Sequence, residues 1–548
     1  MIEPFSAGAS RRHRGRPLLL GVAGVLVLVV GSALVLALLW WPRVTLARDS
    51  RALARVSLPG FAGELSGVVI RDRAGNVVPA QIRKRRIWPA RSLRPGEPLT
   101  IRVTVRRPGW AGWLVGRTEQ RVYRVRTPAA RLRSRWLQVA AGAKVTVSFS
   151  APVQAVRVRV GSDEKALRLG RGRKSVGLGI VASGSRRSGS ALVSAITRLW
   201  ERQPKLVRVT WFPVSPRTQA LVEPAAGTPL RPGDPITITL SKPLAKVLGG
   251  KRPALTPEVP GRWRMLDTHT LSFNPAGLGY PIGADVSLRL GAHVDVTAAS
   301  VKPATRSTLR WSVPDGSLLR LQQLLAQAGY LPLNWTPTTI ADTSATAAES
   351  QLDAVTAPPP GVFSWRYPNT PHELKSLWRP GRPNEITRAA IMMFQDTHRL
   401  EVDSFAGPKF WQALLTDTLA GKHRNDGYSY VYVHRKLPQS LNLWHNGRLI
   451  LSSPGNTGVP AAPTQLGSFP VFEHIPVGTM SGTNPDGSHY HDPGIRYISY
   501  FNHGDAIHAF NRASFGTPQS LGCVELPLPA AAKVWPYTPI GTLVTVEN

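Results

Sequence analysis

The spacing of apolar residues changes twice along this chain of 548 residues. Up to about residue 312, apolar and polar residues alternate in short runs separated by Gly and Pro, which predicts half-buried β-strands. Between Trp311 and Leu415 apolar residues recur every three or four positions, which predicts helices, and from Tyr428 the alternation returns. A chain of this length exceeds a single hydrophobic core. We therefore expect a multidomain protein: a β-rich first part, a small α-helical domain and a mainly-β C-terminal domain.

A turn followed by a strand is repeated in the first part. Residues 93–103 (LRPGEPLTIRV) are similar to residues 230–240 (LRPGDPITITL), and residues 139–149 are a weaker copy. Gly and Pro form the turn, and the alternating Val, Ile and Leu predict a strand with one buried face. Residues 220–312 resemble the Ig-like β-sandwich modules of bacterial cell-surface proteins, and residues 43–219 resemble them more loosely. The resemblance implies a stalk.

The N-terminal region has the pattern of a membrane anchor. Residues 18–41 are almost wholly apolar and carry no charge, which suits the roughly 20 residues that cross a hydrocarbon core. Several arginines precede this segment and two tryptophans end it. We therefore expect a cytoplasmic basic tail over 1–17, a single transmembrane helix over 18–41, and the remainder outside the membrane, extracellular or periplasmic in the cell wall. The alternative is a cleaved signal peptide, whose apolar region would be shorter, about 7–15 residues.

The net charge of +36 favours an anionic partner. The excess is densest between Arg83 and Arg135, where Glu97 and Glu119 are the only acidic residues, whereas residues 428–548 contain six basic and six acidic residues. We expect the basic stalk to contact anionic lipid or a wall polymer. A solvated arginine face is the alternative, and a chain outside the cell rarely meets nucleic acid.

The predicted helical domain covers residues 313–417. Leu318, Leu321, Leu324 and Leu325 fall on one helical face, and a second helix is predicted to be capped near Asn384. This pattern resembles the small peptidoglycan-binding domain. The motif residues that complete the resemblance are Ile386, Phe394, Gln395, Gly407, Pro408 and Trp411. This implies carbohydrate-wall binding, although the helices could simply pack against their neighbours. Residues 331–380 interrupt the pattern and are predicted to be a surface insertion or loop.

The C-terminal region, residues 428–548, alternates again, and strands are predicted at 430–433, 441–443, 449–451, 497–501 and 506–508. Residues 478–487, with three glycines, are predicted to form a polar loop. His508 then ends a strand, and Cys523 follows after one further loop. Because Cys523 is the only cysteine, it cannot form an internal disulfide, and with a nearby histidine it is a candidate nucleophile.

A family resemblance rests on these residues. Ile507-His508, followed by Ser520-x-Gly522-Cys523-Val524-x-Leu526, resembles the signature of L,D-transpeptidases with a YkuD-type catalytic domain. Residues 463–471, 478–483 and 539–544 are similar to that family's opening strand, mobile loop and closing strand. The resemblance covers nearly all of residues 428–548.

The resemblance implies a reaction. Cys523 would attack the amide after the third residue of a donor stem tetrapeptide, with His508 as general base, and would expel D-alanine to leave a thioester. An amine of a neighbouring stem would then form a cross-link between third-position residues of peptidoglycan, without a metal or organic cofactor. Gly522 would let backbone amides face the oxyanion, while Ser520 would orient the site or serve only as a turn hydroxyl. Substrate contacts are expected from Met480, Tyr490, Asn511 and Arg512.

Three positions depart from the family pattern: Leu521, Ala509 and Glu525. Glu525 should disfavour a thiolate unless its carboxylate is hydrogen-bonded or paired, for example with Arg512. Three other hypotheses remain for this region. Histidines 489, 491 and 503 with nearby aspartates could hold zinc, although polar loops of this kind are commonly just solvated. A sortase-like transpeptidase and a catalytically impaired wall-adhesion or scaffold protein also remain alternatives.

Overall fold

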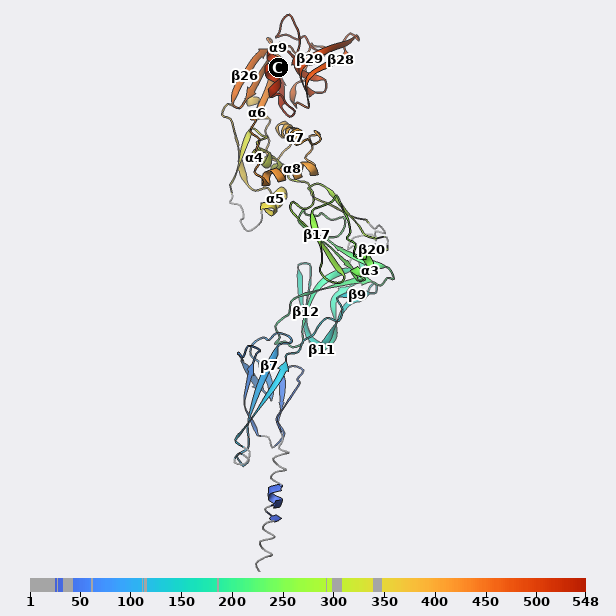
Figure 1. Ribbon diagram of the computed structural model, residues 1–548, viewed down its shortest axis with the longest axis vertical. Coiled ribbons are helices and arrows are strands. Elements are labelled where there is room, and N and C mark those ends of the chain that lie inside the picture. Colours follow the sequence, from blue (N-terminus) through green and yellow to red (C-terminus); the bar gives the residue numbers. More distant parts are fainter. Residues whose placement is uncertain are drawn as a thin grey trace, which may run out of the picture. The chain divides into compact units, whose positions relative to one another are not determined.

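The computed structural model describes residues 25–26, 28–32, 43–60, 63–110, 112, 116–184, 187–291, 293–297, 308–338 and 347–548 (Figure 1). The chain divides into two compact units, Met1–Val214 and Ser215–Asn548. Within the described residues the architecture is mostly β, with a few helices in the second unit.

The predicted localisation as a single-pass membrane protein is contradicted. Nowhere in the described ranges is there a helix long and apolar enough to cross a membrane. Of the predicted segment 18–41, residues 25–26 and 28–32 are described and helical, and the other positions, like the predicted basic tail 1–17, lie outside the described residues.

Strands form the first unit. Two four-stranded sheets enclose one core, and a five-stranded sheet surrounds a second. In chain order within each sheet, the strands are β1 (Thr45–Ala47), β2 (Ala54–Ser57), β5 (Ala80–Arg83) and β6 (Arg86–Pro89); β3 (Glu64–Arg71), β4 (Val77–Val78), β7 (Pro98–Arg106) and β8 (Thr118–Arg126); and β9 (Trp136–Val139), β10 (Lys144–Val160), β11 (Asp163–Val181), β12 (Gly189–Ile196) and β13 (Val207–Pro213). The first repeat forms β7, in which Leu99, Ile101, Val103 and Val105 are buried, so the alternation predicts this strand correctly.

The second unit begins with two sheets around a separate core. The second repeat forms β15, whose Ile236, Ile238 and Leu240 are buried as expected. The elements are β14 (Thr218–Glu223), β15 (Ile236–Leu240), α3 (Leu244–Leu248), β16 (Leu255–Thr256), β17 (Gly261–Met265), β18 (Thr270–Pro275), β19 (Asp285–Arg289), β20 (Val294–Val296) and β21 (Thr308–Ser312).

Helices follow β21. Asn384 caps α7 as predicted, because its side chain accepts a hydrogen bond from the backbone N–H of Thr387 at 2.9 Å. The segment 331–380 contains a β-hairpin and two helices within its described positions. The elements are α4 (Leu318–Gln327), β22 (Leu333–Pro337), α5 (Ala347–Thr356), β23 (Gly361–Trp365), α6 (His372–Ser376), α7 (Glu385–Thr397) and α8 (Pro408–Leu419). Their core continues into Tyr428, Tyr430 and Trp444 of the next domain.

Two sheets form the C-terminal domain and share a core that α9 also covers. One sheet has the order β26-β25-β24-β32-β27 and the other β28-β29-β30-β31. The elements are β24 (Ser429–His434), β25 (Ser440–His445), β26 (Arg448–Pro454), β27 (Gly467–Pro470), β28 (Glu473–Thr483), β29 (His489–Asn502), β30 (Asp505–Ala509), β31 (Val524–Leu526), α9 (Leu528–Val534), the 3-10 turn η2 (Trp535–Tyr537) and β32 (Leu543–Glu547).

The predicted polar loop over 478–487 is wrong for most of its length. Residues up to Thr483 belong to β28, which pairs with β29 in a long antiparallel hairpin visible in Figure 1. Gly478 and Gly482 make room for side chains of the facing strand and do not interrupt β28. A Cβ on Gly482 would lie 2.7 Å from the Tyr490 hydroxyl, and one on Gly478 would lie 3.0 Å from Ile498.

Candidate active site

The parallel pairing of β30 with β31 brings His508 and Cys523 to the same face of the sheet. His508 is opposite Glu525 in this ladder, and Cys523 lies two residues before Glu525. Because side chains alternate along a strand, His508, Glu525 and Cys523 share one face, while Ile507 and Val524 point into the core on the other face. Cys523 directly precedes β31, so its side chain and that of His508 lie on this face, on adjacent segments of the chain.

The imidazole of His508 has a defined tautomer. Its Nδ1 lies 3.0 Å from the backbone oxygen of Ala509, and a carbonyl oxygen can only accept a hydrogen bond. Nδ1 therefore carries the proton and Nε2 carries the lone pair. The side chain is 3 % exposed, and this burial lowers the pKa of His508 below its ordinary value. The result is a neutral imidazole with one basic nitrogen.

The Cys523 thiol is also held in its neutral form. Its Sγ donates to the backbone oxygen of Gly504 at 3.6 Å, and it packs beside a small apolar cluster formed by Ile495, Ile498 and Ala506. Burial, followed by the nearby carboxylates of Asp505 and Glu525, raises the pKa of Cys523 to about 12. The raised pKa of the thiol and the lowered pKa of the imidazole both favour the neutral forms over a thiolate–imidazolium ion pair.

The turn before the cysteine depends on a glycine. Gly522 has a φ of +115°, and a Cβ at this position would lie 2.2 Å from Oδ1 of Asp505. The Ser520 hydroxyl donates to the backbone oxygen of Cys523 at 2.6 Å. Ser520 therefore stabilises the turn that presents the thiol, and its hydroxyl is engaged with the backbone.

Glu525 is paired. Its carboxylate accepts two hydrogen bonds from Arg512, at 2.8 Å from Nε and 2.7 Å from Nη2, and these bonds raise the pKa of the Arg512 guanidinium. The guanidinium also lies 4.6 Å from the ring centre of Phe510. Arg512 therefore balances the charge of the buried carboxylate opposite His508. This pairing is the condition under which Glu525 is expected not to disfavour a thiolate.

The other expected substrate contacts lie on two sides of the site. Met480, on β28, packs against the same apolar cluster as Cys523. Tyr490, on β29, has its pKa raised by burial and by the neighbouring Cys523. Asn511 lines a cavity of about 700 Å³ together with Asp492, Phe510 and other residues of β29 and the segment after β30. The hairpin residues therefore lie near the thiol, whereas Arg512 is committed to Glu525.

The sequence indicated Asp505 only as one of the aspartates near the candidate zinc histidines, and it did not indicate Tyr500. Burial raises the pKa of the Asp505 carboxyl group, which lies against Gly522, and Tyr500 is close enough for Cys523 to contribute to its raised pKa. Seventeen positions separate Asp505 from Gly522, so only the pairing of β30 with β31 reveals this contact. In the part of the chain that the structure describes, no group of three or more His, Cys, Asp and Glu side chains is arranged to hold a metal ion.

Comparison with known protein families decides the identity of this domain. Residues 428–546 match the YkuD family, the L,D-transpeptidase catalytic domain. Solved structures similar to the chain include an L,D-transpeptidase from Mycobacterium smegmatis, with 13 % identity, a TM-score of 0.21, and coverage of 60 % of this chain and 97 % of that one. An L,D-transpeptidase from Mycobacterium tuberculosis H37Rv shows 12 % identity, a TM-score of 0.19, and coverage of 60 % and 96 %.

The catalytic domain of the E. faecium L,D-transpeptidase is also similar, with 26 % identity, a TM-score of 0.20, and coverage of 23 % of this chain and 99 % of that one. No curated protein matches the chain significantly. The YkuD domain contains β24 to β32, and with them Cys523, His508 and their hydrogen-bond partners.

Proposed function

We propose that the chain is a peptidoglycan L,D-transpeptidase in which Cys523 is the nucleophile and His508 the general base. The observation that carries the proposal is the shared face of β30 and β31. Within a YkuD domain, that face carries the chain's only thiol and an imidazole whose Nε2 bears the lone pair, which supports the proposal.

In the first half-reaction, the sulfur of Cys523 attacks the carbonyl carbon of the third residue of a donor stem tetrapeptide. His508 Nε2 takes the thiol proton as the C–S bond forms, because neither group is charged beforehand. The C–N bond to the terminal D-alanine then breaks, and the imidazolium returns the proton to the departing amine. The product is a thioester on Cys523, free D-alanine and a neutral His508.

In the second half-reaction, an amine at the third position of an acceptor stem attacks the thioester carbonyl. His508 removes a proton from the attacking nitrogen and returns it to the sulfur as the C–S bond breaks. This step forms an amide between two third-position residues and restores the thiol. Backbone N–H groups in the turn at Gly522 would stabilise the oxyanion in both steps.

The preceding regions suit delivery of this domain to its polymer. We propose that residues 43–219 and 220–312 are Ig-like spacers and that residues 313–417 contact the peptidoglycan. The supporting observations are the separate buried cores of the β-rich parts and, in the helical region, the burial of the motif residues Ile386, Phe394 and Trp411 in one further core.

Acylation by a carbapenem tests the catalytic assignment. We expect incubation of the chain with imipenem to add one drug-derived mass to the intact protein, and Cys523→Ala to remove that adduct completely. Leu449→Ala, an exposed position on β26, is the matched control and should be acylated at the wild-type rate.

A second measurement separates the transpeptidase from an inactive scaffold. With a stem tetrapeptide as donor and a second stem as acceptor, the wild type should release D-alanine and form a dimeric peptide. Acylation without dimer formation would contradict the proposed acceptor chemistry. An adduct of equal size on Cys523→Ala, or none on the wild type, would refute the role of Cys523.

A further inference from the structure

One sheet of the first unit has a strongly basic outer face. In the sheet β4-β3-β7-β8, Arg102 pairs with Val122, Thr100 with Arg124, and Pro98 with Arg126, so these positions share one face. This arginine face consists of five exposed residues: Arg71, Arg102, Arg106, Arg124 and Arg126. Among the described outward positions of this sheet, Glu64 is the only acidic one.

The sheet itself leaves most of this charge uncompensated. Arg106 reaches Glu64 at 3.5 Å, but the two side chains are 70 % and 83 % exposed, and such surface pairs contribute little. Within the described residues, no ion pair links Arg102, Arg124 or Arg126 to a carboxylate. Like charges on neighbouring strands repel one another, so an anion bound across them would stabilise the face.

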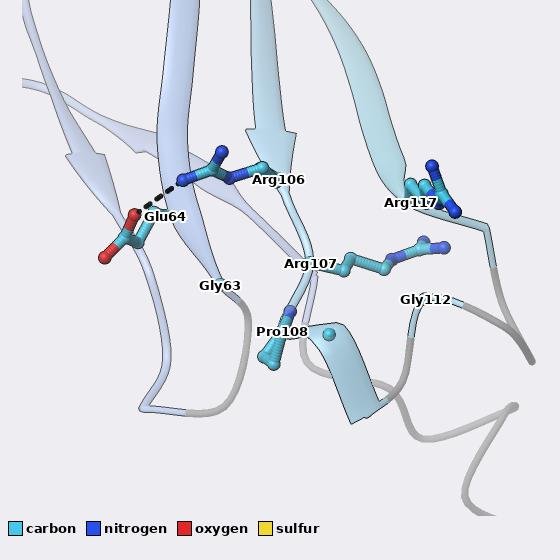
Figure 2. Close-up of a pocket in the computed structure, with 8 residues that line it drawn as sticks. Gly63, Glu64, Arg106, Arg107, Pro108, Gly112 and Arg117 are labelled. Carbon is cyan, nitrogen blue, oxygen red and sulfur yellow. Dashed lines mark hydrogen bonds and ion pairs between the residues drawn. The ribbon is translucent and has the colours of Figure 1, made fainter.

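A cavity of about 760 Å³ continues the arginine face where β7 ends, and its lining includes Arg106, Arg107, Gly112 and Arg117. Figure 2 shows Arg106 extending toward Glu64, while Arg107 and Arg117 extend to the opposite side. Arg107 also contacts the buried Glu119 at 3.3 Å, whereas Arg117 is exposed. The cavity thus adds an exposed cation at the end of the basic surface.

The arrangement of this face indicates the chemistry of its partner. Arg102 and Arg106 are about 14 Å apart along β7, given a rise of about 3.4 Å per residue, so one extended polymer can contact both. Val69 and Val122 lie on either side of Arg102 and are 43 % and 56 % exposed. Thr104 lies between Arg102 and Arg106 on the same face, so uncharged positions separate the cations, which matches a polymer whose anionic groups are separated by short uncharged segments.

Two further features narrow the chemical class of the partner. All five cations are arginines, and the two unshared oxygens of a phosphodiester match the guanidinium fork. The outward positions of the described strands carry no aromatic side chain, whereas sites for single-stranded nucleic acid commonly stack bases on aromatics. We propose that the arginine face binds a linear phosphodiester polymer that lacks bases, with successive phosphates on Arg124, Arg102 and Arg106. This binding does not depend on the transpeptidase activity.

Binding of the full chain to synthetic poly(glycerol phosphate), followed by fluorescence anisotropy over a range of salt concentrations, tests the proposal. We expect Arg102→Gln/Arg124→Gln to weaken binding at least tenfold. The slope of log affinity against log salt should fall by about 1.4, since each phosphate contact with a flexible strand contributes about 0.7. Arg262→Gln/Arg264→Gln removes two exposed arginines from β17 and should change affinity less than twofold.

Three results would overturn the proposal. The first is an absence of salt-dependent binding by the wild type. The second is an equal loss in both double variants, which would make the effect one of net charge alone. The third is binding of single-stranded DNA or poly-L-glutamate of equal length as tight as that of poly(glycerol phosphate), because the face would then not select a base-free phosphodiester.

Discussion

The neutral thiol at Cys523 predicts a distinctive pattern of chemical modification. Because Cys523 is the only cysteine, every thiol alkylation of the chain reports on it. With its pKa raised to about 12, Cys523 is thiolate to only about 3 parts in 10⁵ at pH 7.5, against about a tenth for an ordinary thiol with a pKa near 8.5. The thiolate population is therefore about three thousandfold smaller in the folded protein than in the unfolded chain.

Nucleophilicity offsets part of this difference. A more basic thiolate attacks faster, and a Brønsted coefficient of about 0.45 over a pKa difference of about 3.5 raises the rate constant of the thiolate about fortyfold. We therefore expect iodoacetamide to modify the folded protein about a hundredfold more slowly than the urea-unfolded chain at pH 7.5. The measurement is the rate of carbamidomethylation by intact mass between pH 6 and pH 10.

The pH dependence separates ionisation from steric shielding. A high pKa makes the folded-state rate rise about tenfold per pH unit up to at least pH 10, whereas a shielded thiol of ordinary pKa would reach a plateau near pH 9. A plateau at or below pH 9, or a folded-state rate equal to that of the unfolded chain, would refute the inference that proton transfer accompanies attack.

Three other predictions concern the surroundings of the thiol. Gly522→Ala places a Cβ 2.2 Å from a carboxylate oxygen at a φ of +115° and should destabilise the domain by about 3 kcal/mol. The control Gly487→Ala, at a φ of +87° in open space, should destabilise it by about 1 kcal/mol. Hydrogen exchange in β31 measures both losses of stability, and equal losses would contradict the clash. Arg512→Gln leaves the carboxylate of Glu525 buried without its cation and should lower the stability of the domain by about 3 kcal/mol in the same measurement. Adding Glu525→Gln should restore most of this stability, and no restoration would refute the ion pair as the cause. Because burial lowers the pKa of His508, its base form persists below pH 6.5, so the rate of imipenem acylation should fall only at lower pH; half-loss at or above pH 6.5 would contradict this direction.

Local sequence patterns were sufficient to predict the structure of a segment wherever that structure depends on the segment alone. The alternation in β7 and β15 places Leu99 and Ile236 in separate cores, and Asn384 caps α7 because an N-cap depends only on the next three residues. The motif around His508 and Cys523 likewise identified the catalytic-domain family that residues 428–546 match. The localisation expected from hydropathy was wrong, since the described residues include no helix able to cross a membrane.

The β28–β29 hairpin shows where local reasoning failed. Gly478 and Gly482 suggested a polar loop because glycine commonly marks turns. In the structure their missing side chains leave space for Ile498 and Tyr490 of the facing strand. A glycine that permits close approach and a glycine that turns the chain look alike in the sequence, and only the partner strand distinguishes them.

The sequence alone determined which side chains are available for chemistry: one thiol, a histidine at a strand end and a glycine before the cysteine. The tertiary structure decided how they combine, because alternation sets the face of a residue within its strand but not the strand beside it. The pairing of β30 with β31 places His508 near Cys523 and sets Asp505 against Gly522. The loop after β30 returns Arg512 to Glu525, so the carboxylate that seemed unfavourable in the sequence is neutralised by a residue 13 positions away.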